Sequence, residues 1–199
     1  GADQTPTETS AGGTETDDVR TGGHLRIGFN VLPQTLHPFE GTNGGDITLR
    51  TAAYSRLTRL NQKLEPVPDL ALEWESNDAN DEWTFQLRED AAFSNMDGQN
   101  VRAEDVKATV DMIMENPDSA AAGNLGDFQS LEVEDDYRFT IVLGSSDLLY
   151  PKKIAEADSR FVILPKSVAE GRRDELETTD FGSGPFVVEE YSEGDFLRF

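Results

Sequence analysis

The segment Asn95-Met96-Asp97-Gly98 has the spacing that comes nearest to a metal-binding loop in this sequence. With Glu104 it almost matches D-x-[DN]-x-[DN]-G-x5-E, a pattern in which oxygen ligands at fixed intervals surround a calcium ion. The first ligand is missing, because Phe93 occupies the position of the leading carboxylate. An Asp-Gly turn between a strand and a helix accounts for the same residues. We therefore predict a turn here rather than a calcium site.

Adjacent carboxylates offer a second kind of chemistry, and they occur at Asp17-Asp18, Asp135-Asp136 and Glu189-Glu190. Such pairs act as general acid and base only when burial separates their pKa values. In so acidic a chain, neighbouring acids arise by chance and mostly lie in water. His37, beside Pro38, has the chemistry to bind a metal or to transfer protons, but a lone loop histidine is more often structural or exposed.

Nucleophilic catalysis has no support either. Gly182-Ser183-Gly184 precedes a strand and lacks the strand-to-helix context of a phosphate-binding loop or a nucleophile elbow, so Ser183 is not a credible nucleophile. Cysteine is absent, which excludes thiol catalysis, disulfides and thiolate metal sites within this sequence. We therefore expect a protein that is not an enzyme, with no catalytic residue, no metal and no cofactor.

The charge balance limits the partners of the protein. The 199 residues include 39 acidic and 17 basic residues, which gives a net charge of −22 at pH 7. Such a surface repels phosphate backbones and anionic membranes, so it argues against nucleic-acid and direct membrane binding. No run of residues approaches the 18 apolar positions of a membrane span. An acidic, lysine-poor chain that still carries alternating apolar segments is typical of adaptation to high salt, where cations screen the self-repulsion.

The elements that must position any site follow from the apolar periodicity. Residues 1–23 contain almost nothing to bury and predict a disordered polar spacer. Alternation predicts strands, and spacing at i, i+4, i+7 and i+8 predicts helices. The predicted elements are a strand at 25–29, a helix from Asp46 to about Leu57, a strand at 83–87, a helix at 104–115, a hairpin of 131–134 with 138–143, a short helix from Pro151, a buried strand at 161–164, and a hairpin of 186–191 with 196–199. Because the last strand ends with the chain, we expect an incomplete domain.

Several segments, taken in order, carry a resemblance to a known family. Leu64–Glu75 is similar to that family's "lvPdLAesWe", Trp83–Arg88 to "wTFhLR" and Ala103–Val106 to "tAeDV". Further similar segments are Gly22–Gly28, Thr35–Pro38 (an "LDP" turn with His37 in place of Asp), Tyr54–Leu60, Phe93–Gly98, Val133–Leu143 and Gly182–Phe186. Together these segments resemble the family 5 extracytoplasmic solute-binding proteins of ABC transporters, of the dipeptide- and oligopeptide-binding type.

The resemblance implies an α/β fold that is periplasmic-binding-protein-like (type II, peptide-binding class), with a partial first lobe and an extra subdomain. On that pattern, residues 24–47 begin the first lobe, 48–170 form the extra subdomain, and 171–199 return to the first lobe before a second lobe that this sequence lacks. In this family two lobes close over a solute and deliver it to a membrane permease.

The loop after the first strand supplies part of the cleft wall in this resemblance, so the implied ligand-binding residues are Asn30, Val31, Leu32, Pro33 and Gln34. Pro33 has no N–H to donate, which weakens the transfer of backbone contacts to this position. The implied partners are a peptide or other small solute and the permease subunits of an ABC transporter. The implied location is the outside of the cell, with the membrane reached only through a lipid anchor that precedes this sequence.

Two other hypotheses fit the same residues. One is a surface interaction module that derives from this fold and has no transport role, and the other is a binding protein for nickel complexes or sugars rather than peptides. A secreted hydrolase that uses paired acids is a third class, which no specific motif supports.

Overall fold

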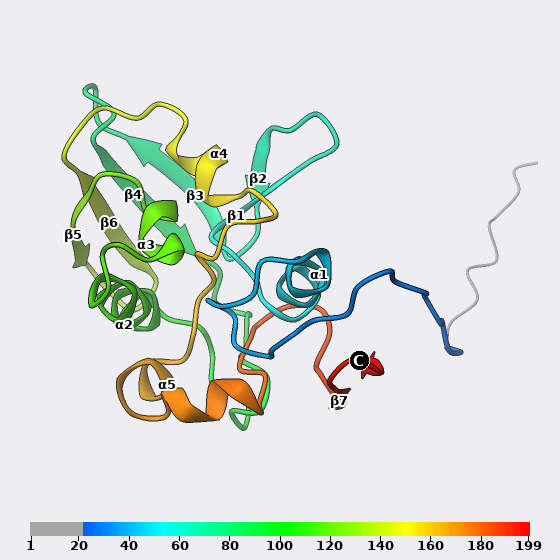
Figure 1. The fold of residues 1–199 in the computed structure, drawn as a ribbon. Helices are drawn as coiled ribbons and strands as arrows, with labels where there is room; N and C mark the ends of the chain where they lie inside the picture. The colour runs from blue at the N-terminus through cyan, green and yellow to red at the C-terminus, as the bar shows by residue number, and fades with distance from the viewer. Residues whose placement is uncertain (1–21) are drawn as a thin grey trace, which may run out of the picture.

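The computed structural model describes residues 22–199, so nearly all of the predicted polar spacer lies outside the described residues. Figure 1 shows the main β-sheet at the upper left of the molecule and the C-terminal hairpin at the lower right. The elements in chain order are α1 (Gly44–Ala53), β1 (Thr58–Leu60), β2 (Pro66–Pro68), β3 (Ala71–Ser76), β4 (Glu82–Leu87), α2 (Ala103–Met114), α3 (Ala120–Asn124), β5 (Phe128–Val133), β6 (Arg138–Leu143), α4 (Tyr150–Ile154), α5 (Lys166–Gly171), the 3-10 helix η1 (Arg173–Glu177), β7 (Glu190–Ser192) and β8 (Phe196–Arg198).

The central sheet has four antiparallel strands in the order β3-β4-β6-β5. The predicted strand at 83–87 and the predicted hairpin at 131–143 are confirmed as β4 and as β5 with β6. Alternate residues of β4 and β6 are buried, as period-two patterning requires. Phe85 pairs with Phe139 in the β4–β6 register, and their rings stack with centroids 5.5 Å apart.

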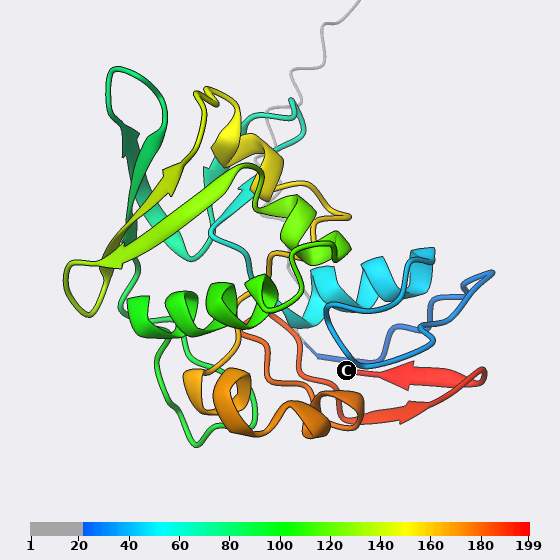
Figure 2. The same cartoon turned by 60° about the vertical axis from the view of Figure 1, so that its left-hand side comes forward.

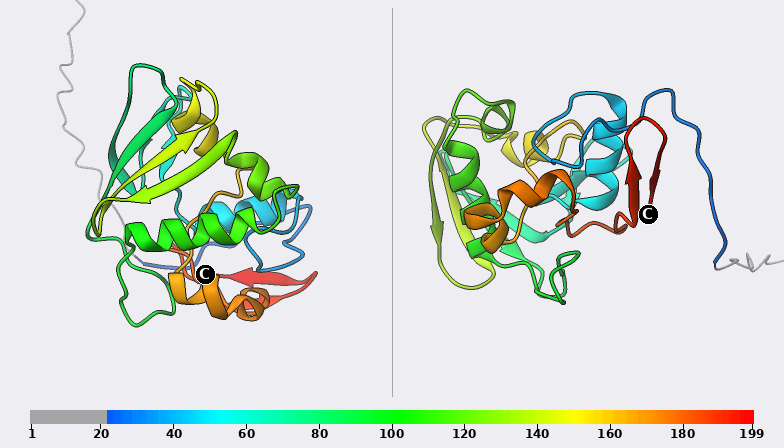
Figure 3. Two further views of the ribbon diagram at one scale, coloured as in Figure 1. Left: turned by 90° about the vertical axis from the view of Figure 1, so that its left-hand side faces the viewer. Right: turned by 60° about the horizontal axis from the view of Figure 1, so that its bottom comes forward.

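Helix α2 packs against the inner face of this sheet, with α5 on its other side (Figures 2 and 3). The predicted helix at 104–115 is confirmed within one residue at each end. Its first turn is held by the Asp105 carboxylate, which accepts a hydrogen bond from the N–H of Arg102 (2.8 Å). The buried side chains Val106, Val110 and Ile113 join the apolar face of the sheet in one core. No helix in the described part of the chain has the length and apolarity to cross a membrane.

Helix α1 begins and ends earlier than predicted. Its N-cap is Asn43, whose Oδ1 accepts from the N–H groups of Gly45 (2.7 Å) and Asp46 (3.0 Å). Asp46, predicted as the cap, is instead the third helical residue and completes a capping box. The helix ends at Ala53, because Tyr54 turns to an extended backbone and its side chain enters the core.

The predicted buried strand at 161–164 is wrong in its secondary structure but right in its burial. All four side chains are fully buried, yet the segment joins no sheet. Phe161 and Ile163 point into the core beneath the sheet, whereas Val162 and Leu164 point into a second core built around α1 and α5. The backbone at its end is satisfied by a side chain: the Leu164 N–H donates to Thr109 Oγ1 (3.0 Å). The segment is thus a shared wall between two cores.

The strand predicted near the N-terminus and the hairpin predicted at the C-terminus differ in outcome. Residues 25–29 form no strand, and Leu25, Ile27 and Phe29 are 84%, 63% and 48% exposed. Their alternating pattern has no backbone partner among residues 22–199, and a strand forms only when a neighbour pairs with it. The C-terminal hairpin is confirmed as β7 with β8, although its first arm begins at Glu190 rather than at Phe186. The helix predicted from Pro151 is confirmed as α4.

Candidate functional site

The loop of the predicted site residues Asn30, Val31, Leu32, Pro33 and Gln34 borders an open hollow of about 410 Å³. All five residues line it, so the structure brings the predicted set together. The other side of the hollow is formed by Glu193 and Gly194, the turn between β7 and β8, and by Asn43 at the start of α1. Sequence reasoning missed these partners, because nothing in their local pattern links a hairpin turn to a loop about 160 residues earlier.

The backbone of this loop is poorly paired where it faces solvent. Among residues 22–199, the N–H and C=O groups of Asn30, Val31 and Leu32 form no hydrogen bond. Asn30 and Val31 are exposed, and Leu32 is half-buried. The backbone bends at Asn30 and Val31, so this is a loop rather than a strand. Donors and acceptors without a partner among residues 22–199, beside a hollow, can pair with the main chain of a bound peptide.

Asp46 holds the other end of the loop in place. Its Oδ1 accepts from the Gln34 N–H (2.8 Å), and its Oδ2 accepts from the Asn43 N–H (2.9 Å). Asp46 is only 2% exposed. Close packing adds to this restraint, since a Cβ on Gly45 would lie 2.3 Å from the carbonyl carbon of Leu32. A single buried carboxylate therefore joins the loop to the N-terminus of α1.

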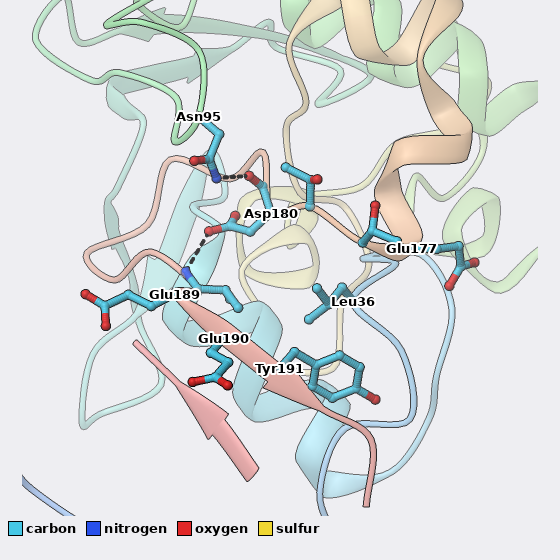
Figure 4. Close-up of a pocket in the computed structure, with 10 residues that line it drawn as sticks. Leu36, Asn95, Glu177, Asp180, Glu189, Glu190 and Tyr191 are labelled. Carbon is cyan, nitrogen blue, oxygen red and sulfur yellow. Dashed lines mark hydrogen bonds between the residues drawn. The ribbon is translucent and has the colours of Figure 1, made fainter. Parts of the chain in front are cut away.

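A second hollow, of about 370 Å³, is lined by residues of β7 and of the segment 177–180 (Figure 4). Asp180 forms its floor: its carboxylate accepts from the N–H groups of Gly182 (2.7 Å) and Val188 (3.1 Å), and its carbonyl accepts from Asn95 Nδ2 (2.8 Å). Burial raises the pKa of Asp180, and the two backbone N–H groups oppose that rise. These bonds indicate a structural carboxylate that shapes the return of the chain toward the hairpin.

The rims of both hollows are acidic. The second hollow is lined by the carboxylates Glu177, Glu189 and Glu190, and the first by Glu193. No basic side chain lines either hollow within residues 22–199. The electrostatic field of this face therefore favours ligands that carry a cationic group and disfavours polyanions.

The calcium-like pattern does not assemble into a ligand set. Asn95 donates to the Asp180 carbonyl, while Glu104 pairs with Lys166 (Oε2 to Nζ, 2.9 Å) on a different face. Positive φ angles at Asn95, Asp97 and Gly98 (57°, 49° and 80°) form the predicted turn.

The remaining chemical candidates lie apart from one another. Asp135-Asp136 and Glu189-Glu190 are exposed on separate hairpins, and Asp17-Asp18 lies outside the described residues. Gly182-Ser183-Gly184 packs against the end of α1, where Gly184 N–H donates to the Ala53 carbonyl (2.9 Å). His37 lies near two glutamates, Glu40 and Glu177.

Comparison with known proteins gives this geometry a context. The family model described as "Bacterial extracellular solute-binding proteins, family 5 Middle" matches residues 65–199. The chain is 28% identical over 183 residues to the probable D,D-dipeptide-binding periplasmic protein DdpA of Escherichia coli (strain K12), which covers 87% of this chain and 34% of that protein. It is 26% identical over 204 residues to the probable ABC transporter periplasmic-binding protein SapA of the same strain, covering 91% and 37%.

A solved structure agrees with these matches. The binding protein MoaA of A. tumefaciens R10, in complex with mannopinic acid, superposes with a TM-score of 0.73 and 30% identity, covering 82% of this chain and 34% of that one. The chain thus spans about a third of the length of the proteins it matches. The expected fold is confirmed: it is the α/β type II fold of the peptide-binding class of periplasmic binding proteins, present as part of one lobe.

Proposed function

The chain belongs to the family 5 extracellular solute-binding proteins, and on that premise we propose that it forms one wall of a cleft that closes over a peptide. The observation that carries the proposal is the backbone of Asn30, Val31 and Leu32, which lies beside an open hollow and forms no hydrogen bond within residues 22–199. A peptide main chain offers complementary donors and acceptors.

Each residue of the loop has a part in this proposal. The main-chain groups of Asn30, Val31 and Leu32 pair with the peptide as an added strand would. Pro33 offers only its carbonyl, which Tyr191 already occupies, so it fixes the loop rather than the ligand. The exposed side-chain amide of Gln34 supplies a polar contact at the end of the hollow.

The acidic rim supports a peptide over an anionic solute. A peptide carries an α-ammonium group, which Glu193 can attract, and its backbone matches the loop. One relative holds mannopinic acid, so a small polar acid of that kind is the second candidate solute. It would need a cationic group elsewhere in the cleft to balance its carboxylates.

The place of the protein in transport extends the proposal. Its family consists of binding proteins rather than enzymes, and its curated relatives are periplasmic. We infer that a second lobe completes the cleft and that the closed form delivers the solute to ABC permease subunits. We also retain, as proposals, a lipid anchor outside this sequence and the division into residues 24–47, 48–170 and 171–199.

Calorimetric titration in molar KCl tests the solute class. Two proteins are titrated: the chain itself and a longer protein that includes the proposed second lobe. The solutes are mixed di- and oligopeptides, mannopinate, nickel–histidine and simple sugars. The proposal expects peptide binding by the longer protein and weak binding by the chain, because closure needs contacts from both lobes. Silence toward peptides from a folded longer protein would overturn it, and heat from another solute would redirect it to that class. Binding to a second protein without any solute would favour the interaction-module hypothesis.

A matched pair of proline variants tests the loop. Val31→Pro removes one N–H that we expect to pair with the peptide. The affinity of the longer protein for peptide should therefore fall about 3- to 10-fold. Ile27→Pro makes the same change at an exposed residue outside the hollow and should leave affinity unchanged. Equal effects from both variants would place the peptide elsewhere.

A further inference from the structure

Three metal-ligating side chains meet at one point beside the second hollow. One imidazole nitrogen of His37 and one carboxylate oxygen each from Glu40 and Glu177 lie within 4.8 Å of one another. His37 is half-buried, and the two glutamates are exposed and therefore accessible to an ion. The residues come from two segments of chain about 140 positions apart.

A tight turn places the first two of these side chains together. His37 and Glu40 are the first and last residues of a four-residue turn in which the Glu40 N–H donates to the His37 carbonyl (3.3 Å). Pro38 at the second position restricts φ to the value such a turn requires. The Phe39 N–H approaches His37 Nδ1 at 3.4 Å, a contact too long to commit the imidazole to one orientation.

Thr35 brings the third side chain to the same place. Its hydroxyl donates to Glu177 Oε2 (2.8 Å) and accepts from the His37 N–H (2.9 Å). The hydroxyl therefore touches both segments and orients the Glu177 carboxylate toward the turn. In metal sites, such a hydrogen bond from outside the ligand set positions the ligand and tunes its affinity.

Neither Glu40 nor Glu177 takes part in an ion pair within residues 22–199, although most of the Lys and Arg side chains in that range do. Two carboxylates this close repel each other, and the net charge of −22 adds to the negative potential around them. A divalent cation would neutralise the pair, and the neutral imidazole would add a third ligand without further charge.

We propose that His37, Glu40 and Glu177 form a binding site that takes Zn²⁺ in preference to Mg²⁺ and Ca²⁺. One nitrogen and two carboxylate oxygens are a ligand set that suits zinc, whereas Mg²⁺ and Ca²⁺ prefer oxygen ligands alone. Three protein ligands leave a fourth tetrahedral position for water.

The fit requires only small movements. Two ligands of tetrahedral zinc at about 2.0–2.2 Å from the ion lie about 3.4 Å apart. The present atoms lie within 4.8 Å, so rotation of the exposed glutamate side chains closes the remaining gap. The bound ion would cross-link the turn at 37–40 to the end of η1. It would thereby stiffen the chain that leads from the candidate ligand-binding loop into α1, independently of any solute.

Zinc titration of the chelator-treated chain tests the site. Zinc chloride is added in calorimetry and in thermal unfolding, with magnesium and calcium chloride as parallel arms. We expect one zinc per chain and a rise in Tm of about 5–10 °C at a hundredfold excess over Kd. Magnesium and calcium should produce neither effect at the same concentrations.

Substitutions locate the ion. His37→Ala and Glu177→Gln should each lower zinc affinity at least about 100-fold, because loss of even an outer-shell partner commonly costs 10- to 100-fold. His24→Ala and Glu189→Gln make the same chemical changes at exposed residues outside the cluster and should bind zinc as the parent does. Circular dichroism confirms that each variant is folded. Zinc affinity that is unaffected by His37→Ala and Glu177→Gln, or that falls equally in the His24→Ala control, would overturn the proposal.

Discussion

The hydroxyl of Tyr191 donates a hydrogen bond to the carbonyl oxygen of Pro33 at 2.9 Å. Tyr191 lies in β7, and Pro33 lies in the loop before α1, 158 residues earlier in the chain. With Asp46 on the other side of the loop, this bond fixes the loop from two directions. Both attachments hold the loop beside the hairpin, where the two segments border the first hollow.

Removal of the Tyr191 hydroxyl should loosen the loop without unfolding the protein. Tyr191→Phe leaves the Pro33 carbonyl without its donor and should cost about 0.5–1.5 kcal/mol. Hydrogen exchange of a peptide that spans residues 29–36 should become faster. Tyr137→Phe is the control, since the Tyr137 hydroxyl makes no hydrogen bond within residues 22–199. Unchanged exchange in Tyr191→Phe would show that this bond does not hold the loop.

Loss of the Asp46 carboxylate should be more costly. Asp46→Ala leaves the N–H groups of Gln34 and Asn43 without acceptors and removes half of the capping box of α1. Two bonds to a buried charged group predict a loss of about 2–4 kcal/mol, read from a lower urea midpoint at unchanged m. Asp78→Ala, at an exposed aspartate without such bonds, should stay within about 0.5 kcal/mol of the parent. Similar midpoints for the two variants would contradict the assignment.

Two glycine-to-alanine changes should act in opposite directions. A Cβ on Gly182 would lie 1.9 Å from the Ala53 carbonyl oxygen, so Gly182→Ala must displace backbone and should destabilise by about 3 kcal/mol. Gly123 lies in α3 with no atom within 4 Å of its Cβ position, so Gly123→Ala should stabilise by about 0.4–1 kcal/mol. Urea unfolding of both variants measures the difference. A Gly182→Ala protein as stable as the parent would refute the close approach of the two segments.

The pH dependence of two aspartates should have opposite signs. Burial raises the pKa of Asp180 above its ordinary value of 3.8, so the folded state binds that proton more tightly than the unfolded state. Its contribution to stability is therefore full below the unfolded pKa and is lost as pH rises through the folded pKa. The hydrogen bond from Arg88 lowers the pKa of Asp90, whose contribution is present above the unfolded pKa and is lost as pH falls through the folded pKa.

Carbon-13 NMR titration of the two carboxyl groups measures both directions. We expect the Asp180 midpoint above 3.8 and the Asp90 midpoint below it, with little effect of Asp90 on stability because that side chain is exposed. An Asp180 midpoint at or below 3.8 would mean that its two backbone hydrogen bonds outweigh its burial.

The sheet and α2 could be predicted from sequence because their patterns are complete within the chain. The apolar side chains that alternate at 83–87 and those at helical spacing in 106–113 are buried in the same core. The residues against which they pack lie among the described residues. The strand predicted at 25–29 failed because a strand needs a neighbour that residues 22–199 do not supply. The prediction of a strand at 161–164 failed because a run of four apolar residues indicates burial on both sides. It does not indicate whether two cores or the two faces of a sheet bury the residues.

The candidate site was only half accessible to sequence reasoning. The loop at 30–34 came from family resemblance, while its partners Tyr191, Glu193 and Asp46 came from the structure. Tyr191 is the only aromatic residue in an otherwise polar stretch, 189–195, which is a signal for packing but not for its partner. The metal cluster likewise needed three dimensions, because Glu177 is far in sequence from His37 and Glu40.

The acidic surface should make stability depend on salt. Surface ion pairs weaken as salt rises, but each is worth about 0–1 kcal/mol, whereas 22 excess negative charges repel one another at every distance within the Debye length. That length falls from about 30 Å at 0.01 M to about 3 Å at 1 M, so the repulsion is almost fully screened in molar KCl. We expect Tm to rise by several degrees between dilute buffer and molar KCl.

Reversal of three exposed acids, Asp78, Glu132 and Glu156, to lysine changes the net charge from −22 to −16, and the Tm of this variant should rise less with KCl than that of the parent. Equal gains in both proteins would attribute the salt effect to something other than charge repulsion, and an unchanged Tm in the parent would refute adaptation to high salt.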